Sequence, residues 1–454
     1  MDASPSASRS VWTSRLGFIL ASAGSAVGLG AIWKFPYMAG TNGGSVFLLP
    51  YVFFTLTIGL ALLIGEMAMG RSAKGGAATA YAKLAGRAWA PFGLISVATG
   101  YFVLAFYSVV GGWCVYYLAQ AVVGNGAVTD PSAMRSAFET FSSAGTLPVL
   151  CHVVFLSATA GVVLCGVEKG IERVSKVLMP LLFILMCVLI VRGLTLPGAF
   201  DGVRFLFTPD PSAFTGEALL NAMGFAFFSL SVGSGSMMNY GSYLSSRVNI
   251  PTSTAWVVLL AILSSILGGL MIMPAVFAFG LSPDAGPGLT FATMPAVFGQ
   301  LPMGDLFAVA FYLCLFVAAL TSAISIFEMS SQYLVDEWGF TRRNAVLLVG
   351  TTLGILGILS ALSFGPLKDV TFFGKTFFDL FDYATSNIGM PIGCLGIALA
   401  AGWAAWPKIE AELRTGAEAG FWRSAGFLTF LRVVMVVFSP IVILVVTAKA
   451  IGLF

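Results

Sequence analysis

Two short glycine motifs contain the groups best suited to bind ions in this sequence. Residues 25–30 read Ser-Ala-Val-Gly-Leu-Gly, and residues 230–235 read Leu-Ser-Val-Gly-Ser-Gly. Glycine destabilises a helix interior by about 1 kcal/mol, and paired small residues favour a break. A helix that unwinds inside a membrane frees carbonyl oxygens that attract cations and amide groups that attract anions. The motifs therefore predict a site for a carboxylate beside a cation, with close helix packing as the alternative explanation.

Other polar residues lie in equally apolar surroundings. Tyr107 is flanked by apolar residues, and residues 318–323 read Ala-Ala-Leu-Thr-Ser-Ala, which places two hydroxyl groups at one level. Glu66 stands in an apolar run, where a charged group is costly and is a functional candidate by default. Hydroxyl groups in such helices also bond their own backbone, so Thr321 and Ser322 alone decide nothing.

The composition indicates that lipid surrounds most of the chain. Of 454 residues, 58% are hydrophobic and 9% are charged, against about 25% charged residues in soluble proteins. The net charge of +3 is spread out and forms no patch for nucleic acid. The single histidine, His152, and cysteines without metal spacing speak against a zinc centre or a Ser–His pair. We therefore expect no enzyme.

Charge-free windows predict eleven membrane-spanning helices, since each needs about 20 mostly apolar residues. Lys176 and Arg192 interrupt the ends of the fifth window, so its boundaries are the least defined. The predicted centres lie near residues 25, 55, 108, 157, 184, 232, 266, 318, 355, 392 and 440.

The distribution of Lys and Arg predicts the orientation. The tail, residues 1–10, is too short for a cleavable signal peptide and is expected in the cytoplasm, with the C-terminus outside. Under this orientation the outer loops hold few cations: Arg135, Arg192, Arg204, Lys368, Lys375 and Lys449. The inner segments hold Arg9, Arg15, Arg71, Lys74, Lys83, Arg87, Lys169, Arg173, Lys176, Arg247, Arg342, Arg343, Lys408, Arg414, Arg423 and Arg432.

The two glycine motifs occupy equivalent places in two halves of the chain. They fall in the first and sixth predicted spans, and five spans between two starts reverse the direction of the second half. We therefore predict an all-α membrane protein with an inverted five-plus-five repeat, broken helices 1 and 6, and an extra eleventh helix. One transmembrane domain would cover residues 11–450, with repeats at about 11–197 and 217–405 and the extra helix at about 425–449.

The order of several motifs resembles the neurotransmitter:sodium symporter family, in particular its bacterial amino-acid branch with eleven helices. The resemblance covers nearly the whole chain. It implies alternating access, with sodium sites beside the substrate. The motifs are Arg-Ser-Val-Trp-Thr-Ser-Arg-Leu-Gly at 9–17, Gly-Ser-Ala-Val-Gly-Leu-Gly at 24–30, Lys-Phe-Pro at 34–36, Asn-Gly-Gly at 42–44 and Glu-Met-Ala-Met-Gly-Arg at 66–71.

The resemblance implies two sodium sites of unequal quality. The second site would use the carbonyl groups of Gly24, Val27 and Ala318 with the hydroxyl groups of Thr321 and Ser322. Oxygen ligands of this kind suit a hard cation.

The first sodium site departs from the family pattern. It would use the carbonyl of Ala26, the hydroxyl of Ser229 and the substrate carboxylate, but Ala31 and Leu260 stand where the family carries Asn. One sodium ion per cycle is therefore expected, with two as the alternative. Ser264 stands where chloride-independent members carry Glu, and we nevertheless expect no chloride requirement.

The same resemblance implies a substrate site at the glycine motifs. A carboxylate would meet the amide groups of Leu29 and Gly30 and the Tyr107 hydroxyl. Gly28 stands where carriers of monoamines have Asp, which favours an α-amino acid. The amino group would meet carbonyls around Ala26, Phe228 and Ser231, and the side-chain pocket would be lined by Val103, Phe228, Ser234, Ser322 and Ile326. Ser234 replaces a bulkier residue, which favours a large apolar or aromatic side chain.

Two gates follow from the resemblance. Outside, Lys34 would pair with Asp382 across the substrate, with Phe228 as a lid; Lys makes a single contact where Arg makes two. Inside, Arg9 would pair with Asp336, braced by Tyr243 and Trp12. Arg342 and Glu337, in contrast, are expected to be solvated interfacial charges.

Three other functions were weighed. A sodium-coupled symporter of another small solute, such as an osmolyte, would carry the same motifs. Gly28 and Tyr107 favour an amino acid over such a solute. A sensor on this fold usually carries a long soluble tail, and an intramembrane protease needs a catalytic pair that a lone His152 does not supply. We predict an integral plasma-membrane protein, bacterial in type, in contact with membrane lipid; its oligomeric state is not predicted.

Overall fold

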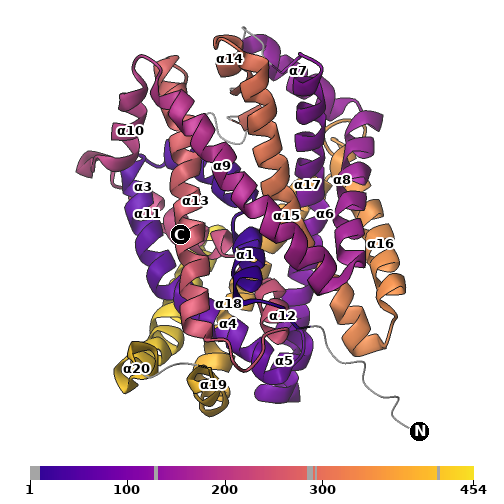
Figure 1. Cartoon of the computed structure of the whole chain (residues 1–454), viewed down its shortest axis with the longest axis vertical. Helices are drawn as coiled ribbons and strands as arrows, with labels where there is room; N and C mark the ends of the chain where they lie inside the picture. Colours follow the sequence, from indigo (N-terminus) through magenta and orange to yellow (C-terminus); the bar gives the residue numbers. More distant parts are fainter. Residues whose placement is uncertain (1–10, 127–130, 284–289, 292–293, 417–419, 454) are drawn as a thin grey trace.

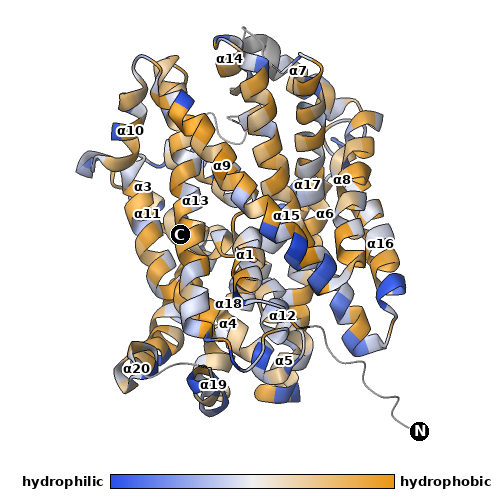
Figure 2. Cartoon of the chain, viewed as in Figure 1, coloured by the Kyte–Doolittle hydropathy of each residue, from blue (hydrophilic) through white to orange (hydrophobic). Residues whose placement is uncertain are grey.

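The computed structural model describes residues 11–126, 131–283, 290–291, 294–416 and 420–453, and within these ranges it contains helices and no β-strand. Nine described helices are long and apolar enough to cross a membrane, and a bent pair makes a tenth. Hydrophobic residues dominate along the long helices, and hydrophilic residues gather at the short helix α19 (Trp406–Arg414), whereas α5 (Ala77–Leu84) is mixed (Figure 2). The predicted all-α membrane class is confirmed.

The nine long helices correspond to nine of the predicted spans. Several combine α-helical and π-helical segments in one continuous rod. They are Ser45–Ala73 (α3, Ser45–Phe54; η2, Thr55–Gly59; α4, Leu60–Ala73), Arg87–Val122 (η3, Arg87–Trp89; α6, Ala90–Val122), Thr146–Leu164 (α8), Val167–Leu194 (η4, Val167–Glu172; α9, Arg173–Leu194), Ile250–Ala278 (α13), Gly304–Trp338 (α15), Arg342–Leu362 (α16), Phe377–Ala404 (α17, Phe377–Tyr383; η7, Ala384–Gly389; α18, Met390–Leu399; η8, Ala400–Ala404) and Ala425–Ala450 (α20, Ala425–Val433; η10, Val434–Phe438; α21, Ser439–Ala450).

The fifth span is longer than its charge-free window. Lys176 and Arg192 both lie inside the helix Val167–Leu194, because each charge has a local partner. The Lys176 ammonium group is 2.7 Å from the Glu172 carboxylate. The Arg192 guanidinium donates a hydrogen bond of 2.6 Å to Thr195.

The first span is broken at the first glycine motif. α1 (Arg15–Ala26) begins at Ser14, whose hydroxyl accepts from the Gly17 amide at 3.0 Å. The chain then resumes as η1 (Gly30–Lys34) and α2 (Phe35–Thr41), bent by 46° from α1.

The sixth span is broken more severely. α11 (Gly216–Ser229) and α12 (Ser236–Ser242) are separated by the turn at residues 230–235. Three residues in this turn have positive φ, namely Ser231 at 55°, Gly233 at 86° and Gly235 at 81°. Glycine adopts this conformation freely, whereas Ser231 is strained. The predicted breaks in helices 1 and 6 are therefore confirmed.

Short helices cover the two ends of the bundle. α7 (Pro131–Ser143), α10 (Ala199–Phe207) and α14 (Met294–Gly299) lie at one end, and α5 and α19 lie at the other (Figure 1). Short segments η5 (Pro211–Ala213) and η9 (Phe421–Arg423) complete the connections. In the interior, α1 packs against α13 and α15, and α15 packs along α6. This packing brings both helix breaks against α6 and α15.

Candidate functional site

A narrow cavity of about 40 Å³ lies where the two broken helices meet α6 and α15. Ten of the predicted substrate residues line it: Ala26, Gly28, Gly30, Val103, Tyr107, Phe228, Ser231, Ser234, Ser322 and Ile326. The other two predicted residues, Leu29 and Ser229, lie beside the cavity without lining it. Ser25 and Met390 also line it and were missed from the sequence.

The break in the first span presents a donor and a small space to this cavity. The Leu29 amide donates a hydrogen bond of 3.1 Å to the Tyr107 hydroxyl, so two of the three groups predicted to meet a carboxylate are adjacent. A side chain at Gly28 would begin 2.8 Å from the Tyr107 oxygen and still closer to the Ser322 hydroxyl. Gly28 therefore keeps open the space between α1, α6 and α15.

Ser25 joins both broken helices to α15. Its carbonyl accepts hydrogen bonds from the Ser231 hydroxyl at 3.1 Å and from the Ser322 hydroxyl at 2.9 Å. Its own hydroxyl lies 2.6 Å from that of Ser325. Ser25 lies inside the first glycine motif, which was the one sign that it could line the site. The direction of its carbonyl, however, depends on how far α1 extends.

The residues predicted for the second sodium site lie at the end of α1 and on α15. The Ser322 hydroxyl lies 3.0 Å from the Gly24 carbonyl oxygen, and the Thr321 hydroxyl lies 3.1 Å from the Ala318 carbonyl oxygen. A side chain at Gly24 would begin 3.1 Å from Cβ of Thr321, so the two helices touch there. Val27 is the residue at which α1 ends. This oxygen-only set suits a hard cation such as sodium.

The predicted first sodium site has fewer side-chain oxygens. Ala31 is buried and Leu260 is half-buried, and neither side chain can coordinate a cation. The Ser229 hydroxyl donates to the Ala226 carbonyl at 3.2 Å, in its own helix. The carbonyl of Ala26 adjoins the cavity from α1. The residues present therefore support the second site better than the first.

A buried carboxylate holds the break in the sixth span. Glu66, on α4, accepts hydrogen bonds from the Gly233 amide at 3.2 Å and from the Met238 amide at 3.3 Å. These amides are left without helical partners by the break. On the other side, the Cys394 thiol lies 3.4 Å from the Val232 carbonyl. Glu66 thus fixes the shape of the turn and lies outside the cavity lining.

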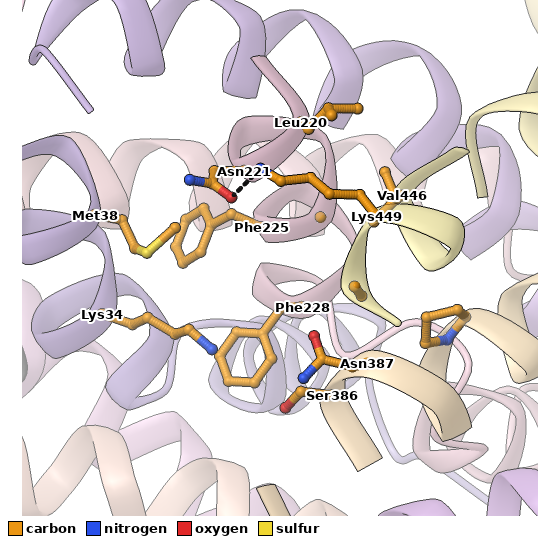
Figure 3. A pocket seen from close by; sticks show the side chains of 13 residues that line it. Lys34, Met38, Leu220, Asn221, Phe225, Phe228, Ser386, Asn387, Val446 and Lys449 are labelled. Atoms are coloured by element: carbon orange, nitrogen blue, oxygen red, sulfur yellow. Dashed lines mark hydrogen bonds between the residues drawn. The ribbon is translucent and has the colours of Figure 1, made fainter. Parts of the chain in front are cut away.

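Phe228 separates the central cavity from a larger outer one. The outer cavity, of about 220 Å³, is lined by Phe228 together with Lys34 and Lys449 (Figure 3). The Lys34 ammonium group lies 3.9 Å from the centroid of the Phe228 ring. Asp382 accepts a hydrogen bond of 2.9 Å from Ser386. No Lys34–Asp382 ion pair is present among the described residues, so that gate stays a prediction, and Lys34 contacts the lid residue itself.

The inner gate residues lie at the other end of α1. The Trp12 amide donates to the Tyr243 carbonyl at 3.2 Å, and its indole donates to the Tyr240 carbonyl at 3.0 Å. Asp336 accepts a hydrogen bond of 2.7 Å from Gln332. Arg9, the predicted partner of Asp336, lies outside the described residues.

An ion pair with a buried carboxylate, which the sequence does not reveal, lies beside this gate. Glu328 on α15 is fully buried and lies 2.6 Å from the Arg342 guanidinium. It also accepts a hydrogen bond of 2.8 Å from the Tyr243 hydroxyl. The prediction that Arg342 is a solvated charge is therefore wrong, because a buried carboxylate needs a cation beside it. In the sequence, nothing distinguishes Glu328 from the other polar residues that follow the apolar part of the helix.

The chain is similar to known proteins along nearly its whole length. A family model described as the sodium:neurotransmitter symporter family matches residues 9–132 and 131–454. The uncharacterized sodium-dependent transporter YhdH of Bacillus subtilis is 43% identical over 97% of this chain and 98% of its own length. The human sodium- and chloride-dependent taurine transporter is 28% identical over 84% of this chain and 68% of its own. The crystal structure of MhsT in complex with L-phenylalanine matches with a TM-score of 0.89 at 40% identity, covering 97% of this chain and all of that one.

Proposed function

The chain belongs to the sodium:neurotransmitter symporter family, and we propose that it imports a neutral, hydrophobic or aromatic amino acid together with sodium. The family membership makes it a sodium-dependent transporter and an integral membrane protein rather than an enzyme. The observation that carries the amino-acid proposal is the Leu29 amide and Tyr107 hydroxyl, 3.1 Å apart, at a cavity that also holds Gly28.

The substrate class follows from the charges around the cavity. No acidic or basic residue is among the described residues that line it, so it favours a molecule that brings its own balanced charges. The carboxylate would bind the amides at the first break and Tyr107, and the amino group would bind carbonyls near Ala26, Phe228 and Ser231. Val103, Ser234 and Ile326 would surround the side chain. The L-phenylalanine bound to MhsT supports an aromatic or large apolar substrate.

The coupling that we propose is one sodium ion per substrate, held at the second site. The absence of side-chain oxygens at Ala31 and Leu260 supports this number, and two ions remain the alternative. We propose no chloride requirement, because the Ser264 hydroxyl donates to carbonyls of its own helix, at 2.6 Å to Leu260 and 3.1 Å to Ala261. Uptake should then be unchanged when gluconate replaces chloride.

Transport would proceed by alternating access. Sodium between α1 and α15 would hold the two helices together in the outward-open state. Substrate would then bring Phe228, with Lys34 above its ring, over the central cavity. At the inner end, separation of Trp12 from α12 and of Asp336 from Arg9 would let α1 swing and hydrate the sodium ion.

Orientation and domain boundaries are part of the same proposal. The N-terminus would face the cytoplasm and the C-terminus the outside of a bacterial inner membrane. Residues 11–450 would form one transmembrane domain, with repeats at about 11–197 and 217–405 and an extra helix at about 425–449. The grouping of α7, α10 and α14 at one end and α5 and α19 at the other supports this orientation (Figure 1).

The alternative substrate is another small solute such as an osmolyte. The match to taurine transporters favours it, since taurine carries an amino group and a sulfonate rather than a carboxylate. A sulfonate needs more donors than the pair formed by the Leu29 amide and Tyr107, which favours the amino acid.

A thermal-shift screen tests the proposal. Purified protein is heated with each proteinogenic amino acid and with taurine, in sodium and in potassium. A ligand that binds the native state alone raises the melting temperature by mass action. Stabilisation by a few apolar or aromatic amino acids in sodium alone is expected. Stabilisation by taurine alone would favour the alternative substrate, another small solute. A folded protein that responds to none of these compounds would contradict both proposals.

A further inference from the structure

A groove of about 480 Å³ opens on the surface of the bundle, well away from the substrate cavity. It runs between α19, the end of η8 and the face of α20 and η10. Trp403, Trp406, Arg414, Leu428, Arg432 and Val436 are among its lining residues. It lies at the end of the bundle that carries α19 and the start of α20 (Figure 1).

The cation inside this groove has an unusual position. Arg432 is exposed, although it lies on a spanning helix about 10 Å from the start of α20 at ~1.5 Å per residue. Its Nε donates to the Gly402 carbonyl at 3.3 Å, and its guanidinium lies 5.7 Å from the Trp406 ring centroid. A guanidinium has five N–H donors, and the hydrogen bonds of the described residues use one of them. Such a charge near lipid is costly unless an anion meets it.

The neighbouring charges do not supply that anion. Among the described residues that line the groove, Glu410 is the only acidic one, and both of its described contacts are with Arg414, at 2.8 and 3.3 Å. Arg423 adds a further cation next to Arg414, whose carbonyl it contacts at 2.9 Å. The groove is therefore positively charged, with the excess charge at Arg432.

Apolar side chains make up most of the rest of the lining, and several of them are exposed. Trp403 is 63% exposed, and the exposed side chains of Val433 and Val437 lie along α20 and η10. A surface that combines a cation with exposed apolar side chains matches a phosphate joined to acyl chains. A soluble anion would use the first feature and leave the second uncovered.

We propose that this groove binds an anionic phospholipid of the surrounding bilayer. Its phosphate would be held by the Arg432 guanidinium, which can donate two parallel hydrogen bonds, and its acyl chains would cover Trp403, Val433 and Val437. With the proposed orientation this lipid belongs to the cytoplasmic leaflet. The inference does not depend on the transported substrate.

The test is a lipid-dependent thermal shift of the full-length protein in mixed micelles. Dioctanoyl phosphatidylglycerol, dioctanoyl phosphatidylcholine and inorganic phosphate are titrated separately. We expect phosphatidylglycerol to stabilise the protein and the other two to have little effect. Arg432→Gln should weaken the apparent affinity for phosphatidylglycerol at least tenfold, and Arg432→Lys should weaken it less. Arg343→Gln, an exposed arginine outside the groove, is the matched control and should behave as wild type.

Three results would overturn the proposal. Equal stabilisation by phosphatidylcholine would remove the charge selectivity, and stabilisation by inorganic phosphate alone would identify a simple anion site. An unchanged response in Arg432→Gln would place the lipid elsewhere. If Arg432→Gln does not fold, Trp403→Ala replaces it, since loss of that exposed ring should weaken phosphatidylglycerol binding severalfold without touching the ion contacts.

Discussion

The two predicted sodium sites share the first helix break and differ in what their second helix supplies. Toward α15, two hydroxyl groups, of Thr321 and Ser322, lie 3.1 and 3.0 Å from carbonyl oxygens of Ala318 and Gly24. Toward α13, Leu260 offers a hydrocarbon side chain, and Ala31 at the break offers only a methyl group. The break in the backbone is shared, so side chains alone distinguish the two sites.

Because of this difference, sodium binding at the second site would not need the substrate, whereas sodium binding at the first site would. At the predicted second site, all five proposed ligands are protein oxygens. At the first site, the substrate carboxylate would have to supply much of the coordination. If the first site is weak, sodium acts mainly by holding α1 to α15 and thereby shaping the cavity that contains Tyr107 and Gly28.

The largest expected effect comes from removing the second site. Thr321→Ala with Ser322→Ala removes two oxygen ligands, and interactions of that kind with a charged group contribute about 1.5–3 kcal/mol each. Sodium affinity should fall about 100-fold or more. The measurement is sodium-dependent binding of the substrate found in the screen. Ser331→Ala, a buried serine on the same helix, is the control. Unchanged sodium dependence in the double variant would contradict the comparison.

A second variant distinguishes loss of substrate from loss of ion. Tyr107→Phe removes the hydroxyl that lies 3.1 Å from the Leu29 amide and leaves the α1–α15 oxygens intact. Substrate affinity should fall about 10- to 100-fold, because one hydrogen bond to a carboxylate is lost. Stabilisation by sodium alone should stay as in wild type. Tyr101→Phe, half-buried on the same helix, serves as control. An equal loss of sodium binding would indicate that the substrate and the ion share one site.

The comparison can also be reversed by completing the first site. Ala31→Asn with Leu260→Asn restores two side-chain oxygens, each worth about 0.5–1.5 kcal/mol as a neutral ligand group. The concentration dependence on sodium should become steeper, with a Hill coefficient moving from one toward two, and half-saturation should fall about fivefold. Each single variant is the control. A wild-type coefficient of two would show that the site is complete already.

The smallest expected effect concerns the lid, which belongs to neither ion site. Lys34→Gln removes the cation 3.9 Å from the Phe228 ring. Such an interaction contributes about 0.5–1 kcal/mol, so the apparent substrate affinity should fall about 2- to 5-fold. Lys449→Gln, in the same outer cavity, should change less. A larger loss with Lys34→Gln, matched by Asp382→Asn, would instead support the predicted Lys34–Asp382 gate.

The sequence predicted the parts of this molecule that depend on local chemistry. Glycine pairs identified both breaks, since a helix interior disfavours glycine wherever it occurs. Apolar windows located the spans, because a spanning helix needs about 20 mostly apolar residues. Most of the cavity lining, including Val103 and Ile326, was also predicted, but through the family resemblance rather than through the residues alone.

The remainder depends on contacts that no local pattern records. The Glu328–Arg342 pair joins α15 to α16, and the half-buried Arg342 becomes the partner of a buried carboxylate only through that packing. The position of Lys34 over Phe228 depends in the same way on how η1 meets α11. Met390 enters the cavity because α18 packs against the turn at residues 230–235, which sequence spacing cannot reveal.

The most direct test of the account is the ratio of sodium to substrate transported. Purified protein is reconstituted in vesicles, and the flux of radioactive sodium is measured together with that of the substrate from the screen. We predict one sodium ion per substrate molecule, with no substrate flux in potassium. A ratio of two would contradict the difference between the ion sites, and substrate flux that persists in potassium would contradict the coupling itself.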